Sequence, residues 1–221
     1  MLTMEEKHRN QLILQTLERV YGGAGPELVY ADAFQLLVAV ILSAQCTDQQ
    51  VNRVTAPLFR AAPNVSAMAA LSVPQIEELI HGVGLYRNKA KNLSLMTQQL
   101  LREFQGQVPS QRSDLERLPG VGRKTASVVL SVAFGVPALA VDTHVFRVSN
   151  RTGLAKAKDP NQTEKQLCEQ IPKEKWSDAH HWLIHHGRYC CKARSPQCEI
   201  CPVKSLCPKR ISDIGEVNIH D

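Results

Sequence analysis

Leu118-Pro-Gly-Val-Gly-Arg-Lys-Thr-Ala126 places a tight turn between two helical stretches, which indicates a helical hairpin. Residues 113–118 predict a short helix before the turn, and residues 123–134 predict a longer one after it. Gly120 and Gly122 let the backbone turn sharply and keep side chains out of the turn. The second helix then begins with free backbone N–H groups and the positive end of its dipole, which together bind phosphate without reading bases. The alternative is an ordinary connection in which the glycines only end helices.

Helical patterns continue on both sides of this hairpin. The apolar run at residues 34–43 is compatible with a buried helix or a buried strand, and Ala31-Asp32 favours the helix because it offers a start. Residues 87–104 place Lys89 and four apolar residues at helical spacing. Alternating strand patterns with Asn-Gly or Asp-Gly turns are absent. The sequence therefore predicts an all-α protein.

Local signals add detail to this prediction. Ser72-Val-Pro-Gln75 and Ser113-Asp-Leu-Glu116 match the capping box, in which a hydroxyl and a residue three positions later cap the start of a helix. Residues 155–160 are polar and predict a linker. Cys46 and Cys168 fall in expected helical segments and are interpreted as small buried apolar residues. The tail after residue 209 lacks an apolar pattern, so we expect it to be loose.

Length, composition and net charge limit the classes of protein to which this chain can belong. The 221 residues suffice for one large domain or two small interlocked ones, and the hydrophobic (43%) and charged (21%) fractions are ordinary for a soluble protein. The net charge of +5 suits a polyanionic partner without proving one. The longest uncharged stretch, residues 125–141, is interrupted by Gly135 and Pro137, which argues against a membrane partner. Four of the seven cysteines crowd into residues 191–207, which favours a metal site in a reducing, cytoplasmic compartment.

Arg123 and Lys124 open the second helix of the hairpin. The helix dipole opposes a cation in the first turn and so favours the neutral amine of Lys124. A neutral lysine amine is a nucleophile that can form a Schiff base at a carbonyl-level carbon. The alternative is a lysine that binds phosphate beside the turn.

The string Val141-Asp-Thr-His-Val-Phe-Arg147 begins another expected helix. Asp142 is placed to cap its N-terminus, and a carboxylate held by helix N–H groups stays ionised. An ionised carboxylate near a sugar stabilises oxocarbenium-like charge, so capping and catalysis are compatible. For His144 a structural hydrogen bond is the favoured role.

Cys191, Cys198, Cys201 and Cys207 form the pattern C-x6-C-x2-C-x5-C. Such dense thiolates in a reduced protein hold metal, and the single C-x2-C pair favours a [4Fe–4S] cluster over a zinc ribbon. Lys192 and Arg194 lie between the first two cysteines, where they could meet phosphates or form a solvated basic surface.

The string at residues 118–126 resembles the helix-hairpin-helix element of the endonuclease III family of DNA glycosylases, and the resemblance covers about residues 10–209. It implies a catalytic lysine at Lys124 and a catalytic aspartate at Asp142. It also implies a [4Fe–4S] cluster on the four cysteines of the 191–207 pattern, with Cys190 as a spare thiol. Leu42-Ser-Ala-Gln45 and Gly84-Leu-Tyr-Arg87 resemble the two loops that fill the gap left by a flipped nucleotide.

The residues that match the gap-filling positions are Gln45 and Leu85. Without the resemblance, the local sequence would suggest a helix-end residue for Gln45 and a core residue for Leu85. An amide can pair with the orphaned base and an aliphatic wedge can hold the stack open. The family architecture implies a helical barrel domain at residues 26–136, which includes the hairpin at 113–134. Residues 1–25 and 137–221 would form the cluster domain, with DNA bound across the cleft between the two.

The implied function is a bifunctional DNA glycosylase and AP lyase of base excision repair, which removes oxidised pyrimidines and cleaves the strand 3′ to the abasic site by β-elimination. The implied partner is double-stranded DNA with damaged pyrimidines or abasic sites, for which a monomer suffices. A monofunctional relative such as an adenine glycosylase is one alternative. A non-catalytic iron–sulfur protein that binds DNA is the other.

Overall fold

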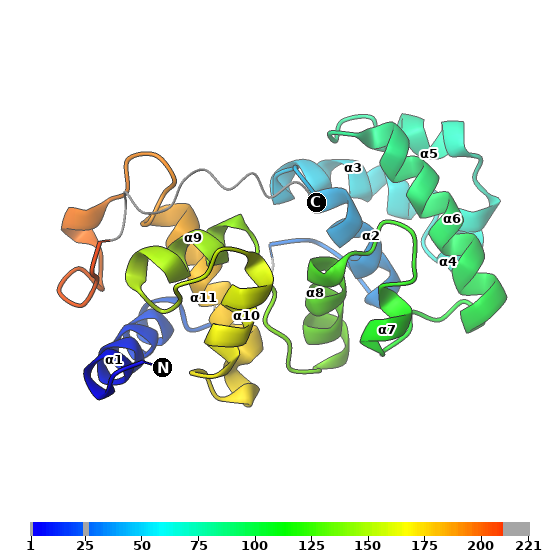
Figure 1. Ribbon diagram of the computed structural model, residues 1–221. Coiled ribbons are helices and arrows are strands. Elements are labelled where there is room, and N and C mark those ends of the chain that lie inside the picture. The colour runs from blue at the N-terminus through cyan, green and yellow to red at the C-terminus, as the bar shows by residue number, and fades with distance from the viewer. Residues whose placement is uncertain (1, 24–26, 210–221) are drawn as a thin grey trace. The chain divides into compact units, whose positions relative to one another are not determined.

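The computed structural model describes residues 2–23 and 27–209 of the chain, and these residues form helices and connecting segments without any β-strand. The all-α prediction is confirmed. The chain divides into two compact units, which are Glu27–Val136 and the described parts of Met1–Pro26 with Pro137–His220 (Figure 1). The domain boundary predicted between residues 25 and 26, and the tail predicted to be loose, lie outside the described residues.

The unit Glu27–Val136 holds seven helices in its described residues. They are α2 (Ala33–Ser43), α3 (Asp48–Ala61), α4 (Val65–Ala70), α5 (Val73–Ile80), α6 (Tyr86–Phe104), α7 (Arg112–Leu115) and α8 (Arg123–Phe134). The helix α2 packs against α3 and α8, while α6 lies along α4 and α5 (Figure 1).

The helix α2 is the buried centre of this unit. Asp32 caps it as predicted, because its Oδ1 accepts a hydrogen bond from the backbone N–H of Gln35 at 2.8 Å. Eight of its 11 residues are buried, which explains why its sequence shows no polar face. Even so, no helix in the described part of the chain is long and apolar enough to cross a membrane.

The two predicted capping boxes have different outcomes. The one at Ser72 is confirmed, since Gln75 Oε1 accepts from the Ser72 backbone N–H at 2.8 Å. The one at Ser113 is wrong, because α7 follows Gln111 as its N-cap and spans only Arg112–Leu115. A proline disfavours helical backbone at the residue before it, so Pro119 prevents the helix from continuing to residue 118.

The other unit combines the N-terminal helix with the C-terminal half of the chain. Its described helices are α1 (Met4–Tyr21), α9 (Thr143–Thr152), α10 (Pro160–Cys168) and α11 (Trp176–Tyr189), with 3₁₀ turns η1 (Lys173–Lys175) and η2 (Cys198–Ile200). Both α1 and α9 pack on α11. Ile13, Leu17, Val145 and Leu183 are fully buried in the core of this unit.

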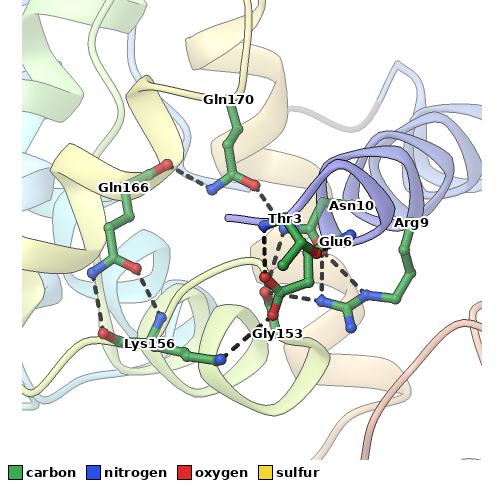
Figure 2. Close-up of polar contacts among 8 residues, drawn as sticks. All are labelled: Thr3, Glu6, Arg9, Asn10, Gly153, Lys156, Gln166 and Gln170. Atoms are coloured by element: carbon green, nitrogen blue, oxygen red, sulfur yellow. Dashed lines mark hydrogen bonds and ion pairs between the residues drawn. The ribbon is translucent and has the colours of Figure 1, made fainter. Parts of the chain in front are cut away.

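Polar contacts attach α1 to residues far along the chain (Figure 2). The buried Asn10 donates through Nδ2 to Gln170 Oε1 at 2.7 Å and to the Gly153 carbonyl at 3.4 Å. The Glu6–Lys156 ion pair at 3.4 Å adds little because Lys156 is exposed. The N-terminal helix is thus built into the same core that carries α9, which Asp142 caps.

Candidate active site and metal centre

The turn of the hairpin depends on Gly120. Its φ of 80° lies in the left-handed region, and a Cβ there would meet Cβ and Nδ2 of Asn92 at 3.2 Å. Gly122 differs, because its φ of −89° suits any residue and a Cβ there would meet nothing within 4 Å. The predicted sharp turn therefore needs Gly120, while Gly122 leaves open space beside the first turn of α8.

The hairpin is fixed by a residue that the sequence analysis missed. Arg112 Nη1 donates to Ser127 Oγ at 2.9 Å and to the Arg123 carbonyl at 3.4 Å. Ser127 Oγ in turn donates to the Arg123 carbonyl at 3.0 Å. These bonds hold α7 against the start of α8, so the turn between them is preformed. Nothing in the local sequence pattern marks Arg112, since the contact spans 15 residues.

Lys124 is the second residue of α8, and its side chain is exposed. The N-cap residue Gly122 has no side chain that could cap the helix. The positive end of the α8 dipole is therefore presented beside an accessible amine, which is the placement that the sequence predicted. Arg123, directly before it, is exposed as well.

Asp142 caps α9 as predicted. Its Oδ1 accepts a hydrogen bond from the Val145 backbone N–H at 2.8 Å, and the residue is half-buried. The preceding segment is buried, and the Ala140 carbonyl lies 2.8 Å from Nδ1 of His180. The carboxylate consequently sits at the fixed N-terminal end of α9, where the helix dipole presents partial positive charge.

His144 has the structural hydrogen bond expected of it. Its Nδ1 lies 3.1 Å from Arg147 Nη2, a group that also donates to the Gly187 carbonyl at 2.9 Å. Burial lowers the pKa of His144, which favours the neutral imidazole, and Nδ1 of a neutral ring can accept from the guanidinium.

The cysteines of the C-terminal loop line a common hollow. Its lining includes Cys190, Cys191, Cys198, Cys201 and Cys207, together with polar residues of α9 and α11. Burial raises the pKa of the thiols of Cys191 and Cys207, which means that their thiolates need a compensating positive charge. A metal centre supplies that charge, so this sulfur-rich hollow fits one.

Cys190 complicates the choice of ligands. It is buried, and its Sγ lies with Cys201 Sγ and a ring nitrogen of His186 in a group whose atoms are all within 4.8 Å of one another. The Cys190 thiol is also 3.7 Å from the Gln197 carbonyl, to which it can donate. The geometry alone thus brings Cys190 as close to the hollow as the four cysteines of the predicted pattern.

The basic loop between the first two cysteines of the pattern is tied to α9. Arg151 is buried and donates to the Lys192 carbonyl at 2.7 Å and to the Ala193 carbonyl at 3.0 Å. Arg147 Nε donates to the Cys191 carbonyl at 3.1 Å. The side chains of Lys192 and Arg194 are exposed. Their charges therefore project from a backbone that α9 holds in place.

Comparison with known proteins identifies the family. Residues 38–173 match the model of the HhH-GPD superfamily of base excision DNA repair proteins. Endonuclease III of Bacillus subtilis (strain 168) is 50% identical over 198 residues, which cover 89% of this chain and 90% of that protein. Endonuclease III of Escherichia coli (strain K12) is 50% identical over 181 residues, covering 82% and 86%. The chain belongs to the endonuclease III family.

A solved structure of an endonuclease III bears out the fold. It is described as a trapped endonuclease III–DNA covalent intermediate, and it superposes with a TM-score of 0.90 at 48% identity over 95% of this chain and 97% of that one. Residues 191–207 match the iron–sulfur binding domain of endonuclease III. The C-terminal loop of this chain accordingly carries a [4Fe–4S] cluster, and the zinc alternative is set aside.

Gln45 and Leu85 share a backbone conformation that is uncommon for residues with a side chain. Their φ angles are 53° and 55°, in the left-handed region, which costs a residue with a side chain roughly 1–3 kcal/mol. Gln45 is exposed and Leu85 is 59% exposed, so the core role that the residues alone suggested for Leu85 is wrong. Exposed residues held in a strained conformation are typical of functional sites.

Proposed function

We propose that this member of the family is a bifunctional DNA glycosylase and AP lyase that removes oxidised pyrimidines from double-stranded DNA. The observation that carries the proposal is the exposed amine of Lys124 at the N-terminal turn of α8, within a preformed hairpin. A glycosylase that only released bases would have no need of a nucleophilic amine there.

In the proposed reaction, the damaged nucleotide is flipped out of the duplex and Lys124 Nζ attacks its sugar C1′. The bond from C1′ to the base breaks, and the proton that the attacking amine gives up leaves with the base. The ionised Asp142 stabilises the positive charge that develops on the sugar.

Opening of the sugar ring turns the C1′ adduct into a Schiff base with Lys124. The Schiff base acidifies the 2′ carbon, which loses a proton, and the C3′–O bond breaks as the phosphate leaves. This β-elimination cleaves the strand on the 3′ side of the abasic site. Hydrolysis of the Schiff base by water then frees the lysine for another cycle.

The DNA backbone is proposed to be held at two places. The turn at Gly120 and Gly122, with Arg123, offers backbone N–H groups and positive charge to one phosphate. Lys192 and Arg194 meet other phosphates as exposed charges on a fixed loop. At the lesion, Gln45 and Leu85 are proposed to fill the space of the flipped nucleotide.

We assign the cluster to Cys191, Cys198, Cys201 and Cys207. The boundaries of the iron–sulfur match, residues 191 and 207, coincide with the first and last cysteine of this set and leave Cys190 outside. When bound, the cluster cross-links the loop through four thiolates and so fixes the backbone that carries Lys192. We further propose that the protein acts as a monomer on chromosomal DNA in the cytoplasm, where thiols stay reduced.

Strand-nicking and base-release assays test the proposal with duplexes that contain thymine glycol or a preformed abasic site. The Lys124→Gln variant should lose nicking on both substrates. The matched control Lys165→Gln, which removes an exposed lysine from α10, should keep it. Full nicking of abasic DNA by Lys124→Gln would refute the role of this lysine.

Two outcomes for the unaltered protein would favour the alternatives. Base release without any nicking would indicate a monofunctional glycosylase. Tight DNA binding without turnover on any oxidised pyrimidine would indicate a binding protein.

A further inference from the structure

A lysine is buried in the unit Glu27–Val136 beside the two strained residues. Lys89 is only 5% exposed and lies on the buried face of α6, where it is the one charged residue among those that the structure describes. Its ammonium group donates to the Leu42 carbonyl at 2.9 Å and to the Ala44 carbonyl at 2.6 Å. These oxygens lie at the C-terminal end of α2, which carries partial negative charge.

The same lysine is attached to the loop that contains Gln45 and to the loop that contains Leu85, both of which have a positive φ. The Ala44 carbonyl that accepts from its side chain directly precedes Gln45. Its backbone N–H donates to the Leu85 carbonyl at 3.1 Å, in the first turn of α6. Lys89 therefore contacts both loops, since its side chain binds the Ala44 carbonyl and its backbone N–H binds the Leu85 carbonyl.

Other contacts bring the two loops together without fixing these residues. A Cβ built at Gly84 would lie 3.6 Å from the Gln45 carbonyl. Gln50 Nε2 donates to the Gly82 carbonyl at 3.1 Å, and a Cβ at Gly82 would overlap that nitrogen at 2.5 Å. The first contact lies between the two loops and the second joins α3 to the loop before Leu85, whereas the ammonium group of Lys89 binds the Ala44 carbonyl directly.

A purely structural role does not require a lysine at this position. Burial lowers the pKa of Lys89, which shows that the site disfavours the charge it holds. A methionine has similar length and would fill the same apolar surroundings without that cost. What a methionine lacks is a donor for the carbonyls that precede Gln45.

We propose that Lys89 is a positioning residue that locks Gln45 and Leu85 in the strained conformations in which they enter the DNA together. Lys89 touches no DNA itself, because it is buried under the two loops. The inference rests on the proposed function of Gln45 and Leu85 as the residues that fill the gap. Without the ammonium group, the backbone at Ala44 and Gln45 relaxes and the two side chains no longer insert as a pair.

The test compares Lys89→Met with Lys89→Arg, which keeps a charged donor, and with Lys91→Met, which removes an exposed lysine from the same helix. Single-turnover release of thymine glycol is measured on duplex and on single-stranded DNA, where no gap needs filling. Lys89→Met should slow release from the duplex about 10-fold, equivalent to about 1.4 kcal/mol. It should leave single-stranded release and binding to undamaged duplex unchanged, and Lys89→Arg should restore most of the loss.

A mutant cycle separates positioning from general damage to the fold. In a Gln45→Ala/Leu85→Ala background, Lys89→Met should have almost no further effect on release from the duplex, because the residues through which it acts are gone. Equal losses in both backgrounds, or an unchanged rate in the single variant, would overturn the inference. If Lys89→Met does not fold by circular dichroism, Lys89→Leu, which also lacks a donor, takes its place in the cycle.

A failure of the underlying function gives a different result. If Gln45→Ala/Leu85→Ala alone leaves release from the duplex unchanged, these side chains do not fill the gap, and the inference falls with its premise. That outcome is read from the double variant before Lys89 is changed, so the two failures are distinguishable.

Discussion

Replacing Asp142 by asparagine separates its two proposed roles. Asparagine and aspartate are similarly good N-caps, so Asp142→Asn should keep the bond to the Val145 N–H, now 2.8 Å, and change the free energy of unfolding by only a few tenths of a kcal/mol. Asp142→Ala removes the cap and should cost about 0.5–2 kcal/mol. Both variants lose the negative charge.

If the charge stabilises the sugar cation, both variants should slow base release about 100- to 1,000-fold, whatever their stability. The assays are single-turnover release of thymine glycol and urea unfolding monitored by circular dichroism. Asp159→Asn is the matched control, because Asp159 caps α10 through a bond of 2.9 Å to the Gln162 N–H. This control should keep both stability and activity.

The reasoning is refuted if Asp142→Asn releases the base at the rate of the unaltered protein while Asp142→Ala does not. That pattern would make Asp142 a helix cap alone. Loss of activity in proportion to loss of stability across the variants would lead to the same conclusion.

Three further predictions concern the cluster, its loop and the core around α11. Cys191→Ser should lose bound iron and the visible absorbance of the cluster, whereas Cys190→Ser should keep both; the reverse result would exchange the two ligands. The double variant Lys192→Gln/Arg194→Gln should bind damaged and undamaged duplexes more weakly alike, and the slope of log affinity against log salt concentration should decrease by about 2. A loss of affinity confined to damaged DNA would contradict the contact of these two residues with phosphates. Burial lowers the pKa of His181 from 6.5 to about 4. Between these two pH values His181 is protonated in the unfolded chain and neutral in the folded one, so the free energy of unfolding decreases as the pH falls. His181→Gln should therefore flatten the fall in the free energy of unfolding between about pH 7 and 5, measured by urea titration, and equal slopes would show that His181 does not carry it.

Features with local causes were predictable from the sequence. Asp32 and Asp142 were expected to cap their helices, and they do, because an N-cap bond reaches only three residues along the chain. The left-handed turn at Gly120 is local in the same way. By contrast, the expected burial of Cys46 in a helix is wrong, since this residue is half-exposed between α2 and α3.

Features that depend on distant contacts were not predictable. Lys89 reaches a carbonyl 47 residues away, and Arg151 reaches one 41 residues away. Each looks like an ordinary helix residue in the sequence, and only the tertiary packing brings its side chain to the backbone carbonyls of a loop. The strained backbone of Leu85 was hidden for the same reason, because periodicity does not reveal where a helix start is forced into the left-handed region.

Trapping of the Schiff base identifies the residue that attacks the sugar. The protein is mixed with a duplex containing thymine glycol in the presence of borohydride, which reduces the imine to a stable amine, and the cross-linked peptide is sequenced by mass spectrometry. A covalent adduct on Lys124, absent in Lys124→Gln and present in Lys165→Gln, is the predicted result. An adduct on any other residue, or base release with no adduct at all, would contradict the assignment of Lys124 as the nucleophile.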